Sequence, residues 1–154
     1  MQEIERKFLV KDSKEILYLP SEYIIQAYFL YASDGTARVR IVNNKTAVLT
    51  IKKDISDIRR WEFEYNIPLE DARIMVEKLS NGKIIEKRRA DFLYAGKKWE
   101  IDIYSGKNEG LIMAEIELKS EDESFEKPPW LGKEVTADKR YLNACLAEKP
   151  FLEW

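Results

Sequence analysis

Histidine is absent from the 154-residue chain, and cysteine occurs once, at Cys145. The lack of imidazole excludes the commonest general base, every histidine metal site and the Ser-His and Cys-His nucleophile pairs. A single thiol cannot form an internal disulfide, which agrees with a reducing, cytoplasmic location.

Long apolar runs are also missing. The longest, residues 23–32, is interrupted by Gln26, so the sequence predicts neither a signal peptide nor a membrane span. The formal net charge is only −2 although 35% of the residues are charged, and this balance argues against a nucleic-acid partner. Because no shift in composition marks a linker, we expect one domain over residues 1–154, and a homodimer is kept as a candidate assembly.

Alternation of polar and apolar residues predicts about eight short strands, beginning with "EIERKFLV" at Glu3. Turn signals at residues 33–35 and 43–45 separate three of them. Residues 69–80 instead have apolar residues at i, i+3, i+4 and i+7, which predicts an amphipathic helix. A second helix is expected to begin near Thr136 or Asp138, either of which could cap it.

Pairs of charged residues two positions apart recur on several of these strands. Because side chains alternate along a strand, the members of each pair project to the same side. The opposite side is apolar and is the face that we expect helices to cover. The pairs are Glu3/Glu5, Arg38/Arg40, Glu62/Glu64, Lys87/Arg89, Glu100/Asp102 and Glu115/Glu117.

Two architectures satisfy this pattern. The charged face could be the solvated side of an open antiparallel sheet, or the sheet could close with its charges inside. We favour the closed form, because a solvated face normally mixes in Thr, Ser and Gln. Clustered carboxylates suit divalent cations and fixed Arg and Lys suit phosphate, so a polyphosphate chelated by Mg²⁺ or Mn²⁺ would satisfy both sets.

The strand motifs resemble a known family over essentially the full chain. "EIERK", "TARVR", "TIKK", "RRWEFE", "EKRR", "WEID" and "AEIEL", in this order, are similar to the CYTH superfamily of triphosphate tunnel metalloenzymes, and "EVTADKRYLN" is similar to its short bacterial branch. The resemblance implies an α+β, mainly antiparallel β fold: a closed eight-stranded barrel with a charged lumen and flanking helices. Ala27 stands where the branch usually has Gly, a departure that bears on the shape of the lumen.

The resemblance also implies roles for individual residues. Those implied to bind the triphosphate are Lys7, Arg38, Arg40, Lys52, Arg60, Lys87, Arg89 and Arg140. Those implied to hold one or two Mg²⁺ or Mn²⁺ ions are Glu3, Glu5, Glu62, Glu64, Asp102, Glu115 and Glu117. Those implied to act in catalysis are Tyr28, Glu5, Glu117 and Lys87. Alternatively, Arg60 and Arg140 are structural ion-pair partners, and Tyr28 is a lining aromatic without a proton role.

The leading hypothesis is metal-dependent hydrolysis of a triphosphate, either inorganic tripolyphosphate or a small organic one, by a metal-activated water. Such phosphoryl transfer needs mainly positioning and charge neutralisation. Three alternatives stay open: an adenylyl cyclase of the same superfamily, a non-catalytic polyphosphate or nucleotide binding module, and a barrel whose charged face is merely solvated.

Overall fold

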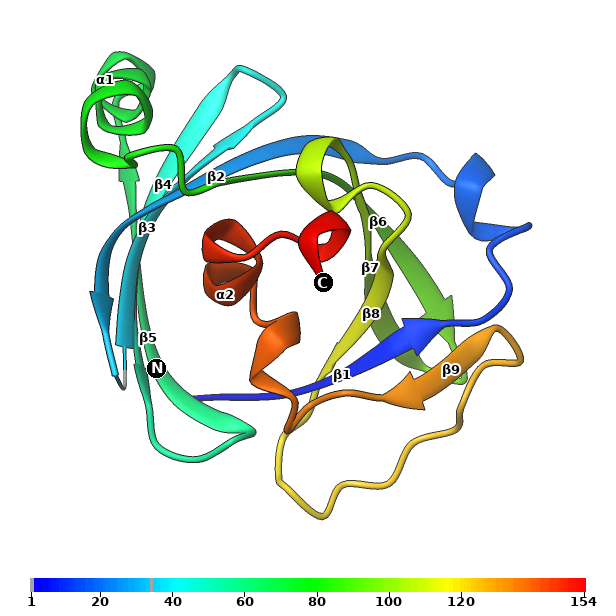
Figure 1. Cartoon of the computed structure of the whole chain (residues 1–154). Coiled ribbons are helices and arrows are strands. Elements are labelled where there is room, and N and C mark those ends of the chain that lie inside the picture. Colours follow the sequence, from blue (N-terminus) through cyan, green and yellow to red (C-terminus); the bar gives the residue numbers. More distant parts are fainter. Residues whose placement is uncertain (1, 34) are drawn as a thin grey trace.

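The computed structural model describes residues 2–33 and 35–154. Within these residues the strands form one antiparallel sheet in the order β5-β4-β3-β2-β6-β7-β8-β1-β9, and β5 also pairs with β1. This last pairing closes β1 to β8 into the predicted barrel (Figure 1). The strands are β1 (Gln2–Val10), β2 (Glu22–Ala32), β3 (Gly35–Val42), β4 (Thr46–Asp54), β5 (Arg59–Ile67), β6 (Ile84–Tyr94), β7 (Lys97–Tyr104), β8 (Ile112–Glu117) and β9 (Leu131–Glu134).

Two α-helices accompany the barrel, α1 (Leu69–Leu79) and α2 (Asn143–Glu148). The first matches the predicted helix. The second begins later than expected, because Asp138 caps a separate 3₁₀ turn by accepting a hydrogen bond from the backbone N–H of Arg140. The 3₁₀ turns are η1 (Ile16–Tyr18), η2 (Gly106–Asn108), η3 (Lys139–Tyr141) and η4 (Phe151–Glu153).

Of the two predicted turns, the one at residues 43–45 joins β3 to β4, with Asn43 and Asn44 at φ 51° and 53°. Asparagine tolerates this left-handed conformation better than most residues. The other turn, at residues 33–35, includes Asp34, which lies outside the described residues. No helix in the described part of the chain is long and apolar enough to cross a membrane.

One edge of β1 is shared by two strands. Near its start Glu3 pairs with Arg60 of β5, and near its end Phe8 pairs with Glu134 of β9. The sequence did not reveal β9, because this strand spans only four residues directly after Pro129 and Trp130 and is too short to show alternation. It nevertheless fills the edge that β5 leaves open.

The outer face of β1, β7 and β8 forms an aromatic core. Trp99 is fully buried, and its ring makes edge contacts with Phe8, Phe125 and Trp130 at centroid distances of 5.7, 5.6 and 5.8 Å. Such edge-to-face pairs stabilise beyond their buried area. The residues that alternate with the charged pairs of β1 therefore pack outside the barrel, as predicted.

Helix α1 covers the outer face of β2, β3 and β4 (Figure 1). Ala27, Val39 and Ala47 meet Ala72 of the helix, and all four are buried. Small side chains let the helix approach the sheet closely. Ala27 thus faces α1 rather than the lumen, so its departure from the branch pattern does not alter the lining.

Helix α2 occupies a different place from the one expected. It lies within the ring of strands and not on the outer face (Figure 1). Toward this end of the barrel the inward side chains become apolar, and Ile85, Tyr104 and Met113 pack against Ala144 and Leu146. The alternating charges stop there, and the inner face gains an apolar core of its own. The helix therefore closes one end of the barrel.

We expect Trp99→Ala to lower the free energy of unfolding by about 3–5 kcal/mol, because it leaves a large void in the outer core. The matched control is Trp61→Ala on β5, where the side chain is 42% exposed. That change should cost about 1 kcal/mol or less. Urea unfolding followed by far-ultraviolet circular dichroism measures both, and equal losses would contradict the assignment of the core.

Candidate functional site: a charged cavity inside the barrel

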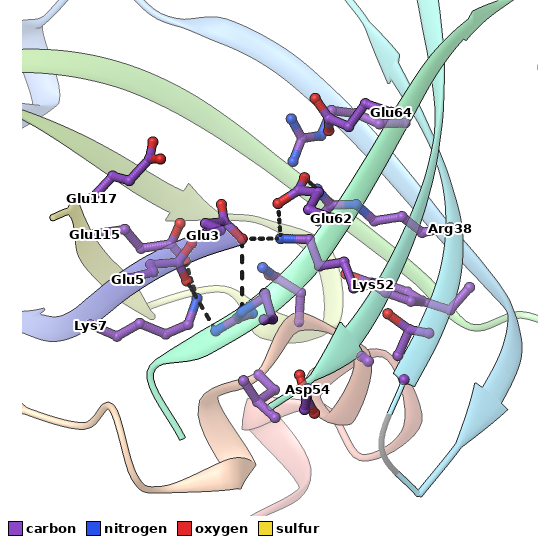
Figure 2. Close-up of a pocket in the computed structure, with 18 of the residues that line it drawn as sticks. Glu3, Glu5, Lys7, Arg38, Lys52, Asp54, Glu62, Glu64, Glu115 and Glu117 are labelled. Carbon is purple, nitrogen blue, oxygen red and sulfur yellow. Dashed lines mark hydrogen bonds and ion pairs between the residues drawn. The ribbon is translucent and has the colours of Figure 1, made fainter. Parts of the chain in front are cut away.

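A cavity of about 210 Å³ lies inside the barrel, walled by strands and closed by residues at the start of α2. Figure 2 shows the carboxylate and ammonium groups of β1, β4, β5 and β8 directed into it. Its lining residues are Glu3, Glu5, Lys7, Tyr28, Gly35, Thr36, Arg38, Arg40, Lys52, Asp54, Arg60, Glu62, Glu64, Arg89, Glu100, Glu115, Glu117, Leu142, Asn143 and Ala144.

Lys7 is held between two carboxylates of neighbouring strands. Its Nζ lies 2.5 Å from Oε1 of Glu5 and 2.5 Å from Oε1 of Glu115, which faces Lys7 across the β1–β8 ladder. Burial opposes the charge, but Glu115 and Glu5 outweigh it and raise the pKa of Lys7 above its ordinary value. The ammonium is therefore a permanent, positioned cation.

A second buried group joins β6, β7 and β8. The carboxylate of Asp102 accepts from Lys87 Nζ at 2.6 Å and from Nε and Nη2 of Arg89 at 2.7 Å each. Arg89 Nη2 also reaches Glu115 at 3.0 Å. Burial would raise the pKa of Asp102, but Arg89 and Lys87 hold it below its usual range. Asp102 thereby fixes the guanidinium that faces the cavity.

Lys87 lies directly behind this wall. Its side chain is fully buried, as is that of Asp102, and neither lines the cavity. Burial, only partly offset by Asp102 and reinforced by Arg89, lowers the pKa of Lys87 to about 7. Lys87 thus contacts Asp102 from behind the wall and holds its proton less tightly than an exposed lysine does.

Arg38 and Arg40 on β3 share a neutral partner. The fully buried Gln26 of β2 accepts from Arg40 Nε at 2.9 Å and from Arg38 Nη1 at 3.5 Å, and its Nε2 donates to the Tyr28 hydroxyl at 3.3 Å. Arg40 forms no ion pair with any described residue. Burial, with Arg38 and Arg89 nearby, lowers its pKa to about 10. Arg38 reaches Glu62 at 4.0 Å, so the positive charge of this part of the wall that lacks an ion-pair partner among the described residues is that of Arg40.

Glu3 links β1 to the opposite wall. Its Oε2 lies 3.1 Å from Nζ of Lys52 and 3.7 Å from Nε of Arg60, and Lys52 also contacts Glu62 at 3.0 Å (Figure 2). The register explains these contacts, because Lys52 faces Glu62 across β4–β5 and Glu3 faces Arg60 across β1–β5. Arg60 is therefore both part of the lining and an ion-pair partner.

Carboxylates dominate the end of the cavity away from α2. Glu117 ends β8, whereas α2 packs near the start of that strand, and no cation lies within ion-pair distance of Glu117 among the described residues. Burial, Glu3 and Glu100 raise the pKa of Glu117, with smaller contributions from other carboxylates. Glu117 therefore adds negative charge to this mouth without an ion-pair partner in the described part of the chain.

The structure brings most of the sequence-predicted residues together in the lining. Lys87 and Asp102 lie behind it. Arg140 lies elsewhere, because its guanidinium pairs with Asp138 at 2.7 Å and stacks on Trp154 outside the cavity. This geometry agrees with the alternative of a structural ion-pair partner for Arg140.

Sequence reasoning missed several lining or supporting residues. Gln26 could have been found, because it interrupts an apolar strand two positions before Tyr28. Asp54 extends the alternation of Lys52, and Glu100 was noted as a paired acid without being assigned to the site. Asn143 ends the motif "EVTADKRYLN", but that motif did not place it in the site, because α2 enters the cavity only in the folded barrel.

The carboxylate oxygens that line the cavity are chemically suited to bind a hard divalent cation. Carboxylate oxygens are the preferred ligands of such ions, and the raised pKa of Glu117 shows that its surroundings favour added positive charge. Within the described residues, however, no three acidic side chains already converge as ligands. Glu3, Glu5 and Glu115 instead pair with Lys52 and Lys7.

A CYTH domain model matches residues 1–149. The chain belongs to the CYTH domain family. It is 42% identical to an inorganic triphosphatase of Acetivibrio thermocellus, over 97% of this chain and 96% of that protein. It is 34% identical to an inorganic triphosphatase of Nitrosomonas europaea, over 96% and 97%.

Comparison with solved structures agrees with the assignment to the CYTH domain family. A crystal structure of an inorganic triphosphatase superposes with a TM-score of 0.66 at 33% identity, covering 94% of this chain and 93% of that one. A Hippeastrum protein, described as a putative adenylyl cyclase with dominant triphosphatase activity, has a TM-score of 0.56 at 16% identity, over 77% and 80%. The second likeness concerns the fold alone.

We expect Asp102→Asn to lower the free energy of unfolding of this CYTH domain by about 3–5 kcal/mol, because it leaves Lys87 and Arg89 buried without their shared anion. Urea unfolding at pH 7 is the measurement. Asp91→Asn on the same strand as Arg89 is the control, since the ion pair of Asp91 to Lys98 at 3.6 Å is exposed. A loss no larger than in the control would contradict the role of Asp102.

Glu117→Gln should stabilise the metal-free CYTH domain at pH 7. A carboxyl group whose pKa is raised by folding costs stability when it is ionised, so its neutral isostere relieves that cost. The gain should shrink as the pH falls through the raised pKa toward the ordinary value of the carboxyl group, because wild type then becomes neutral as well. Thermal melts in chelator at pH 7 and pH 4 test this, with the exposed Glu77→Gln as control. A destabilisation at pH 7 would refute it.

Proposed function

We propose that the protein hydrolyses a triphosphate, with inorganic tripolyphosphate as the first candidate, in the presence of a divalent cation. The observation that carries the proposal is that two unneutralised regions share one cavity: positive charge around Arg40 and negative charge around Glu117. An anion alone would satisfy only the first region. A polyphosphate with its bound Mg²⁺ or Mn²⁺ would satisfy both.

The cations of the wall would bind the phosphate oxygens. Lys7, Arg38, Arg40, Lys52, Arg60 and Arg89 line the cavity and suit this role. Gln26 holds two of the guanidinium groups apart without neutralising them. Lys87 acts through Asp102, which holds Arg89 in place. Because these groups are positioned before substrate binds, little reorganisation is needed as charge develops on the leaving phosphate.

Carboxylates at the mouth would hold the metal. Glu3, Glu5, Glu115 and Glu117 are the leading ligands, with Glu62 and Glu64 on the opposite wall. A bound divalent cation would supply charge neutralisation and an activated water. Asp102 is poorly placed as a direct ligand, because three short contacts to Lys87 and Arg89 occupy its oxygens.

Tyr28 is the candidate proton acceptor. Its phenol lines the cavity and is 3% exposed, and its oxygen receives a hydrogen bond from Gln26. We also propose a cytoplasmic location, in which Cys145 stays reduced. The homodimer stays a prediction, which analytical ultracentrifugation would test.

Purified protein should release phosphate from tripolyphosphate only when Mg²⁺ or Mn²⁺ is present. Glu117→Gln should weaken Mn²⁺ binding at least roughly 10-fold, measured by calorimetry, and lower turnover accordingly. This variant separates function from folding, because we expect it to be more stable than wild type when metal is absent. Glu77→Gln on α1 should leave both quantities unchanged.

Product analysis decides between the candidate activities. Phosphate and pyrophosphate from tripolyphosphate support hydrolysis, whereas cyclic AMP from ATP would indicate a cyclase. Tight tripolyphosphate binding without turnover would indicate a binding module. Metal-independent turnover that survives Glu117→Gln would overturn the proposal.

A further inference from the structure

The closed end of the cavity presents an amide side chain. Asn143 begins α2 and lines the cavity floor together with Leu142 and Ala144. Around it the barrel is apolar, since Tyr104, Met113 and Ala144 form one packed cluster. Among the described residues that line the cavity, Asn143 is the only one with an amide side chain.

The orientation of this carboxamide is set by β7. The hydroxyl of Tyr104 donates to Oδ1 of Asn143 at 2.6 Å. The Nδ2 group, which carries two N–H donors, then has no acceptor among the described residues, and Asn143 lines the cavity. A directed N–H donor in a cavity whose wall also carries fixed cations such as Lys7 and Arg38 is suited to a phosphate oxygen.

The position of α2 also limits how a ligand can enter. Because α2 packs inside one end of the barrel (Figure 1), a chain-like anion that enters through the carboxylate mouth near Glu117 would meet this helix at the far end of the cavity. The portion that reaches the floor must be an end of the ligand. An ester group there would meet Leu142 and Ala144, next to the buried apolar cluster of Tyr104 and Met113.

We propose that the Asn143 carboxamide binds the free terminal phosphoryl group of the substrate, so that only triphosphates with at least one unesterified end are accepted. This inference rests on the proposed triphosphatase function. Tyr104 is a positioning residue, since it acts on the substrate only by fixing the amide.

Asn143→Asp tests the contact. The carboxylate still accepts from Tyr104 but replaces the donor by an anion, so the KM for tripolyphosphate should rise about 10-fold or more, with a smaller change in kcat. The control is Asn81→Asp, an exposed residue of the turn after α1, which adds the same charge outside the barrel. Tyr104→Phe should raise KM less, because it frees the amide without removing it. A KM for Asn143→Asp within twofold of the control would overturn the proposal.

A second measurement uses wild-type protein and needs no substitution. A nucleoside 5′-triphosphate, which has one free end, should compete with tripolyphosphate, whereas a dinucleoside triphosphate esterified at both ends should not. Equal inhibition by the two compounds would overturn the requirement for a free end. If wild type itself does not turn over tripolyphosphate, the proposed function fails; if it does but Asn143→Asp behaves as the control, only this inference fails.

Discussion

The burial of charge inside a closed sheet is the constraint on which the rest of this structure depends. Each ammonium or carboxylate removed from water must find a partner of opposite sign or lose its charge. Lys7 between Glu5 and Glu115, and Asp102 between Lys87 and Arg89, meet this requirement within the protein. Their ion pairs also tie neighbouring strands together, so the lining and the barrel stabilise each other.

The candidate site lies where buried charges lack a partner of opposite sign among the described residues. Arg40 in the wall and Glu117 at the mouth lack ion-pair partners among the described residues. Burial and neighbouring like charges lower the pKa of Arg40 and raise that of Glu117. The folded state would be more stable if Arg40 and Glu117 each had an ion-pair partner. A site that stays unneutralised is instead prepared for a ligand of matching charge, and the aromatic outer core around Trp99 offsets the cost.

Much of the site could be predicted because it follows from strand geometry. Glu3, Glu5 and Lys7 lie on one side of β1 for the same reason that Phe8 lies on the other, and closure of the barrel turns that side inward. The exact positions and contacts of individual side chains could not be predicted in this way. Alternation places Asp102 on the inner face, but only contacts with β6 show that it is enclosed behind Arg89.

The sequence by itself determined the strands, their charged and apolar faces, helix α1 and the family, because these depend on side chains near one another along the chain. Tertiary structure alone decided three features: the place of α2 inside the barrel, the edge strand β9, and the position of Arg140 outside the cavity. Each depends on contacts between segments that are far apart in sequence, so the local alternation of polar and apolar residues does not predict it. The floor of the cavity, and with it Asn143, exists only once the C-terminal segment has entered the closed sheet.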